Sequence, residues 1–69
     1  MRADIGQVCV CRRGRTGVVT KIIHMVDKPT MRKVAIYKGI GFDGKPWQTE
    51  YPKILASNIE EYIGKTHGD

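Results

Sequence analysis

Apolar and polar residues alternate over short stretches of this chain, a pattern that is typical of half-buried β-strands. Four stretches are rich in β-branched residues and bounded by glycine or proline, so they predict strands over 7–12, 18–25, 32–42 and 46–51. The second stretch carries apolar side chains on both of its faces, so alternation does not decide which face points inward. The pattern therefore predicts the strands but leaves their orientation open.

Glycine and proline mark the connections between these strands. Arg13-Gly14-Arg15-Thr16-Gly17 predicts a tight turn in which both glycines adopt positive φ, which costs glycine little. Pro29 predicts a loop over 26–30, because proline lacks the amide donor that a strand needs. Asp43-Gly44 predicts a hairpin with a type I′ turn, in which both central residues have positive φ.

The C-terminal segment is compatible with two structures. We predict a single 3₁₀ turn at Ser57–Ile59 followed by a last strand at Glu60–Ile63, with fraying over 65–69. The alternative is a helix of one to two turns over 57–63, because the residues from Ser57 to Glu60 fit a capping box. The apolar residues of this segment also fall on one helical face, so both structures stay open.

Strands at this spacing, joined by glycine turns, close most easily into a small barrel. Gly39 and Gly41 favour a bulge or a sharp bend in the third strand. The 69 residues leave room for one domain over 1–69, and 41% of them are hydrophobic, as in an ordinary globular protein. We therefore predict a single all-β domain with less than about 15% α-helix.

No segment of the sequence is typical of a membrane protein or a secreted protein. The longest apolar runs are a few residues long, whereas a membrane-spanning helix needs roughly 20. The first residues, Met1 to Gly6, lack the apolar core of a signal peptide. We therefore expect a cytoplasmic protein with no membrane partner.

The two cysteines, Cys9 and Cys11, lie in one predicted strand and point the same way. Side chains at this spacing are roughly 6.5–7 Å apart, which is too far for a disulfide without a distorted backbone. Together with His24 and His67 they do not supply the paired ligand spacings of a structural zinc site. We therefore expect two free thiols, as in a reducing compartment, with no metal and no other cofactor.

Motifs of catalytic sites are absent from the sequence. Glu60 and Glu61 are adjacent and so point in different directions, and no Gly-x-Ser-x-Gly nucleophile motif occurs. Gly14-Arg15-Thr16-Gly17 is too short for a phosphate-binding loop. A chain of this length also has little room for a substrate pocket beside its core. We therefore expect a non-catalytic protein with no small-molecule substrate.

Positive charge is concentrated in the N-terminal half of the chain. Residues 1–38 contain nine Lys and Arg against two acids, a net charge of +7, whereas 39–69 contain three Lys against five acids, a net charge of −2. This asymmetry favours an anionic partner, and clustered guanidinium groups bind phosphates. The candidate nucleic-acid-binding residues are Arg12, Arg13, Arg15, Lys21, Arg32 and Lys33. We expect the strand ends and loops to present the arginines and Lys33 together.

The order of short strand, basic glycine turn and long valine-rich strand resembles the KOW motif of ribosomal proteins and transcription elongation factors. The resemblance covers Gly6 to Ile22 through Gly6, Val8, Val10, Arg13, Gly14, Gly17, Val19 and Ile22. It implies a small, partly open five-stranded barrel of the Src-homology-3-like kind with one short 3₁₀ or α turn near the C-terminus, and it implies RNA binding. The segment between Val10 and Arg13 is shorter than in that family, which usually carries another glycine and a basic residue there.

The aromatic residues allow a second function. Bases could stack on exposed members of the group Tyr37, Phe42, Trp47 and Tyr51, but we expect two or more of these to fill the core. Trp47 suits either the core or an exposed binding surface. The alternative is therefore a protein-interaction module or small accessory subunit that docks through the 42–51 hairpin, with Phe42, Trp47 and Tyr51, or through an open sheet edge. A nucleic acid, RNA or DNA, and a protein both stay open as partners.

Overall fold

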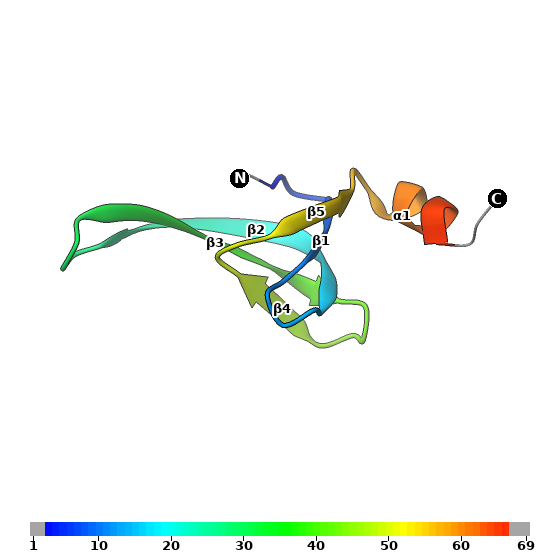
Figure 1. Ribbon diagram of the computed structural model, residues 1–69, viewed down its shortest axis with the longest axis horizontal. Coiled ribbons are helices and arrows are strands. Elements are labelled where there is room, and N and C mark those ends of the chain that lie inside the picture. The colour runs from blue at the N-terminus through cyan, green and yellow to red at the C-terminus, as the bar shows by residue number, and fades with distance from the viewer. Residues whose placement is uncertain (1–2, 67–69) are drawn as a thin grey trace.

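The computed structural model describes residues 3–66, and its main feature is one antiparallel sheet of five strands (Figure 1). The elements are β1 (Val8–Val10), β2 (Thr16–Asp27), β3 (Arg32–Gly41), β4 (Pro46–Thr49), β5 (Lys53–Ala56) and the helix α1 (Ile59–Thr66). The strands lie in the order β4-β3-β2-β1-β5, so β4 and β5 form the two edges and the sheet is not closed. The prediction of a small, partly open all-β fold is confirmed.

The first four strands lie within two residues of their predicted bounds, but the fifth strand lies elsewhere. It is β5, directly after Pro52, and not the segment 60–63. β5 pairs with β1, with Cys9 opposite Ile54, and so joins the C-terminal part of the chain to its first strand. A four-residue stretch between a proline and a helix cap is too short for alternation to identify.

The segment after β5 forms a helix, so the predicted 3₁₀ turn and strand at 57–63 are wrong and the helical alternative is right. Asn58 caps α1, because its Oδ1 accepts the backbone N–H of Glu61 at 2.8 Å. Oε2 of Glu61 in turn accepts the backbone N–H of Ser57 at 2.8 Å. The predicted capping box is therefore displaced by one residue, since the cap is Asn58 and not Ser57.

Lys65 and Thr66 are the last residues of α1, and 67–69 lie outside the described residues, so the fraying over 65–69 stays a prediction. The ring of Phe42 meets that of Tyr62 edge-on, with centroids 5.1 Å apart, and this contact holds α1 against the β3–β4 turn. With eight residues, α1 keeps the helical content of 3–66 below the predicted limit. No helix in this part of the chain has the length and apolar character needed to cross a bilayer.

The β1–β2 and β3–β4 turns share one geometry. In the first, the N–H of Gly14 donates to the carbonyl of Cys11 at 2.9 Å, and Gly14 has φ 85°. In the second, the N–H of Gly44 donates to the carbonyl of Gly41 at 2.9 Å, and Gly44 has φ 79°. A three-residue hairpin loop that ends on a left-handed glycine has this pattern. The hairpin at Asp43-Gly44 is confirmed, but its type I′ turn is wrong, because Asp43 does not have positive φ.

The core gathers around the indole ring of Trp47. The buried apolar side chains are Ala3, Val8, Cys9, Val19, Tyr37, Trp47 and Ala56. Nε1 of Trp47 donates to the carbonyl of Arg15 at 2.9 Å, which satisfies the polar atom of this ring. Gly17 lies against the same ring, and a Cβ at this position would be 2.6 Å from Cγ of Trp47. Gly17 is thus required by close packing and not by the positive φ that we predicted.

β2 and β3 are the longest strands, and their far halves leave the body of the molecule as a two-stranded arm (Figure 1). Their pairing continues to Asp27 opposite Arg32, whereas β1 accompanies β2 only to Val18 and β4 accompanies β3 only to Tyr37. We call residues 21–36 the arm. The arm makes the molecule elongated, with extents of 48 × 21 × 18 Å.

Candidate nucleic-acid interface

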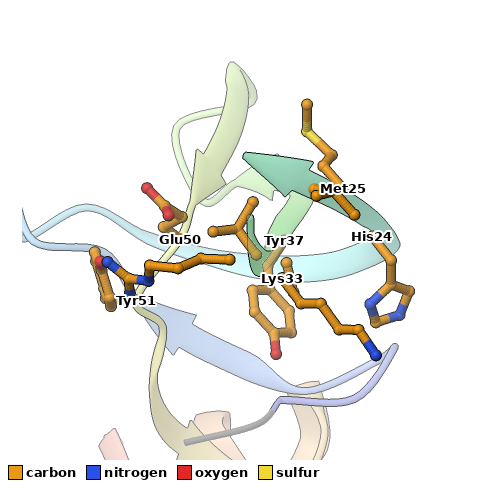
Figure 2. A pocket seen from close by; sticks show the side chains of 10 residues that line it. His24, Met25, Lys33, Tyr37, Glu50 and Tyr51 are labelled. Carbon is orange, nitrogen blue, oxygen red and sulfur yellow. The ribbon is translucent and has the colours of Figure 1, made fainter. Parts of the chain in front are cut away.

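A half-open pocket of about 530 Å³ lies along the arm, beside the connection between β4 and β5 (Figure 2). We call it the arm pocket. Its lining comes from the end of β2, the start of β3 and that connection, and its polar and aromatic members are His24, Arg32, Lys33, Tyr37, Glu50 and Tyr51. Figure 2 shows Lys33 and His24 on one side of Tyr37, with Glu50 and Tyr51 on the other side.

An aromatic ring and a guanidinium group meet at one end of the arm pocket. Tyr51 is 56% exposed although it is a large aromatic residue, so its ring is open to a ligand. The guanidinium carbon of Arg12 lies 5.6 Å from the centre of that ring, within the range of a cation–π contact. The β1–β2 turn supplies Arg12 and the β4–β5 connection supplies Tyr51, so the fold joins segments that are far apart in the sequence.

Two further cations line the same pocket. Arg32 and Lys33 are the first residues of β3, and both are exposed. Among residues 3–66, Glu50 is the one carboxylate in the lining of the arm pocket. With Arg12 on the ring of Tyr51, three permanent cations border the pocket against a single acid. The arrangement can hold a negatively charged ligand that also has a flat ring.

Arg15, which we predicted as a phosphate contact, is bound within the molecule. Its guanidinium Nη2 donates to both carboxylate oxygens of Asp43 at 2.9 and 3.1 Å, and its Nη1 donates to the carbonyl of Pro46 at 3.0 Å. Hydrogen bonds from the Lys45 amide and from Arg15 lower the pKa of Asp43 below its ordinary value. Arg15 therefore ties the two turns together, and we remove it from the candidate interface.

Arg13 and Lys21 are exposed but do not line the arm pocket. Arg13 lies in the β1–β2 turn next to Arg12. Lys21 pairs with Lys38, and by strand alternation both lie on the face opposite to Tyr37. The predicted set of cations is therefore divided: Arg12, Arg32 and Lys33 meet at the arm pocket, and the other three do not.

The three aromatic residues predicted as a protein-docking surface do not form one surface. Trp47 is buried with 2% exposure, so of the two places that the sequence left open it occupies the core, and it cannot belong to a docking surface. Phe42 is half-exposed and contacts Tyr62 of α1. Tyr51 belongs to the arm pocket. The 42–51 hairpin therefore offers separate aromatic residues and no common binding face.

Both cysteines are free thiols. Burial raises the pKa of Cys9, which belongs to the core. Burial also raises the pKa of Cys11, but hydrogen bonds from the backbone of Arg15 and Arg13 outweigh this effect and leave it below its ordinary value. Within residues 3–66, no group of three or more His, Cys, Asp or Glu side chains could hold a metal ion. His67, the other sequence candidate, lies outside that range.

Two polar residues of the arm pocket, His24 and Glu50, were not predicted as part of a nucleic-acid site, whereas Tyr51 was named from the sequence as a possible stacking surface. Strand alternation places His24 on the same face as Ile22, two residues earlier. Ile22 pairs with Tyr37, so His24 lies on the face of Tyr37 once this pairing is known. No local signal places Glu50 and Tyr51 beside the arm, because the chain reaches them after β4. Comparisons with protein-family models, curated proteins and solved structures find no match to this chain.

Proposed function

We propose that this chain is a non-catalytic, cytoplasmic module that binds single-stranded nucleic acid along the arm pocket. The observation that carries the proposal is the exposed ring of Tyr51, with Arg12 against it and Arg32 and Lys33 in the same pocket. A base stacks on the ring of Tyr51, and neighbouring phosphates contact the three cations.

A single strand suits this pocket better than a duplex does. Stacking on Tyr51 needs an unpaired base, because the faces of paired bases are covered by their neighbours. Glu50 is an acceptor for the exocyclic amino group of such a base, which gives the single acid of the pocket a role beside the cations. The resemblance to the KOW motif also favours a nucleic-acid partner, through the basic turn that carries Arg13.

Substitution of Tyr51 tests this function. We expect Tyr51→Ala to weaken binding by about 1–3 kcal/mol, the usual contribution of one stacked base, and Tyr51→Phe to retain the affinity. The measurement is fluorescence anisotropy with short single-stranded RNA and DNA probes at low salt. Phe42→Ala is the matched control, because Phe42 is about equally exposed but lies away from the pocket.

Two outcomes would count against the proposal. No binding of either probe at low salt would reject a nucleic-acid partner altogether. Equal loss of affinity in Tyr51→Ala and Phe42→Ala would reject the arm pocket as the site.

A further inference from the structure

Within residues 3–66, the outer edge of β2 has no partner strand along the arm. β1 pairs with β2 only to Val18, and the segment before β1 extends this contact by hydrogen bonds of Gly6 and Gln7 to Val19. From Lys21 to Asp27, β3 is the only strand within residues 3–66 that pairs with β2. Figure 1 shows this part of the ribbon beyond the rest of the sheet. The edge therefore presents unpaired backbone amides and carbonyls.

The side chains along this edge resemble those of an interior strand more than those of a protected edge. Ile22, Ile23, Met25 and Val26 place apolar groups on both faces, and Met25 and Val26 are each about half-exposed. Natural edge strands are usually short or carry inward-pointing charges, which prevent pairing with another chain. A two-stranded ribbon is also marginally stable in water by itself. The unpaired backbone groups and the exposed apolar side chains of the arm therefore allow another strand to pair with β2, and this pairing would stabilise the arm.

We propose that this edge pairs with the same edge of a second copy of the chain, in antiparallel orientation and centred on His24. In this register Lys21 lies opposite Asp27 of the second copy, and Asp27 lies opposite its Lys21. Ile22 lies opposite Val26, and Ile23 lies opposite Met25. Every apolar residue thus meets an apolar residue, and the two charges at the ends of the segment form two ion pairs across the interface.

The charges select this register over its neighbours. If the pairing shifted by one residue, the face of one copy that carries the arm pocket would lie beside the other face of the second copy. A shift of the centre to Ile23 places Lys21 opposite Met25 of the second copy, and a shift to Met25 places Asp27 opposite Ile23. Neither shifted register pairs the two charges, so the register centred on His24 is the one with charge complementarity.

The surroundings of the two charged residues fit this pairing. Lys21 lies opposite Lys38 in the β2–β3 ladder, and like charges in that position destabilise a sheet. Neither lysine forms an ion pair with another residue of 3–66, so a carboxylate from a second copy would relieve the repulsion. One carboxylate oxygen of Asp27 accepts the hydroxyl of Thr30 at 2.6 Å, and the other can accept Lys21 of the second copy.

The free edge of β3 is a poorer candidate for self-pairing. Its arm segment begins with two cations, Arg32 and Lys33, and contains no acid up to Ile36. Antiparallel pairing of this segment with itself would therefore bring no opposite charges together. Pairing through β2 leaves the lining of the arm pocket from β3 open and produces a four-stranded ribbon, β3-β2-β2-β3, with a two-fold axis at His24. The two pockets then lie on the same face, because the two-fold axis is perpendicular to the ribbon.

Charge reversal tests the register. We expect the chain to be a dimer by sedimentation equilibrium, and expect Lys21→Asp or Asp27→Lys alone to weaken the dimer by at least about tenfold. The double variant, with both substitutions, should restore the affinity because it exchanges the two charges. Lys45→Asp is the matched control, since Lys45 lies in the β3–β4 turn and should leave the dimer unchanged. A monomer at every concentration, an assembly larger than a dimer, or a double variant as weak as the single ones would overturn the proposal.

A cross-link tests the same register without relying on charge. Opposite residues of an antiparallel pair have Cα atoms about 4.5–5.5 Å apart, which is within the range for a disulfide. We expect His24→Cys, combined with Cys11→Ser, to form a disulfide-linked dimer under mild oxidation. Lys28→Cys in the same background should not, because its two copies would be about 27 Å apart along the ribbon. Equal cross-linking of the two variants would overturn the register.

Discussion

Gly17 has no side chain, and this leaves room for the indole ring of Trp47. Gly17 lies directly against the indole ring, and a Cβ at this position would lie 2.6 Å from Cγ of Trp47. We expect Gly17→Ala to lower the free energy of unfolding by about 1–3 kcal/mol, because the buried ring has to shift. Gly64→Ala is the control: Gly64 is exposed in α1 with open space around it, so alanine should stabilise the fold by up to about 1 kcal/mol. Denaturant unfolding of both variants is the measurement, and a Gly17→Ala variant as stable as the wild type would contradict the packing.

The sequence predicts the β1–β2 turn but not the contacts that its residues make with the β3–β4 turn. The glycine-rich turn and its basic residues were predictable, and Gly14 does have positive φ. The role of Arg15 was not, because Asp43 lies 28 residues further along the chain and the sequence does not indicate that the two turns meet. The burial of Trp47 could not be inferred from the sequence either, because its hydrogen bond to the Arg15 carbonyl also depends on the meeting of these two turns.

At the scale of elements, the carboxylate of Glu61 supports the N-terminal end of α1 beside the Asn58 cap. The backbone N–H of Ser57 and the ammonium of Lys65 bind Glu61 and lower its pKa from the ordinary 4.5 to about 2. The ionised form is thus favoured in the folded state, so the contribution of Glu61 is complete above about pH 4.5 and is lost as the pH falls towards 2. We expect α1 to become less stable over this range, as measured by NMR shifts of its amides.

Glu61→Gln provides the matched comparison for this titration. The amide oxygen keeps the acceptor for Ser57 but has no charge to lose, so the pH dependence of α1 between about 4.5 and 2 should become shallower. Glu60→Gln is the control, because Glu60 makes no contact with the cap. An unchanged profile in Glu61→Gln would mean that a different carboxylate controls the end of α1.

The elements themselves were only partly predictable. β2, β3 and the hairpin that joins β3 to β4 follow from alternation and from glycine turns, which are local signals. β5 and α1 were assigned wrongly because four residues after Pro52 show too little alternation, and because Ser57 and Asn58 both suit a helix cap. The contacts of Glu61 with Ser57 and Asn58 decide between the two caps, and they appear only in the folded chain.

At the scale of the whole molecule, the fold separates cations that the sequence places in one basic half. Arg15 lies at the end of the sheet where the β1–β2 and β3–β4 turns meet, and Lys45, which comes from the acidic half of the chain, lies at the same end. Arg32 and Lys33 lie at the far end of the β2–β3 ladder, and Arg12 joins them through Tyr51. This division could not be derived from net charge, because it depends on how far β2 and β3 extend beyond their neighbours. Binding that uses the arm pocket should therefore depend on some lysines and not on others.

The salt dependence of nucleic-acid binding measures this division. If Arg12, Arg32 and Lys33 each neutralise one phosphate, the logarithm of the binding constant should fall against the logarithm of salt concentration with a slope of about −2 for a single strand. Lys33→Ala removes one of these contacts and should flatten the slope by about 0.7.

Lys45→Ala removes the same charge from the opposite end of the sheet and should leave the slope unchanged, so the pair separates a local contact from the general effect of net charge. The measurement is anisotropy with one probe at several salt concentrations, on variants whose melting temperatures match the wild type, since exposed lysines contribute little to stability. Equal flattening by the two substitutions would show that the phosphates follow the overall field of the molecule and do not bind in the arm pocket.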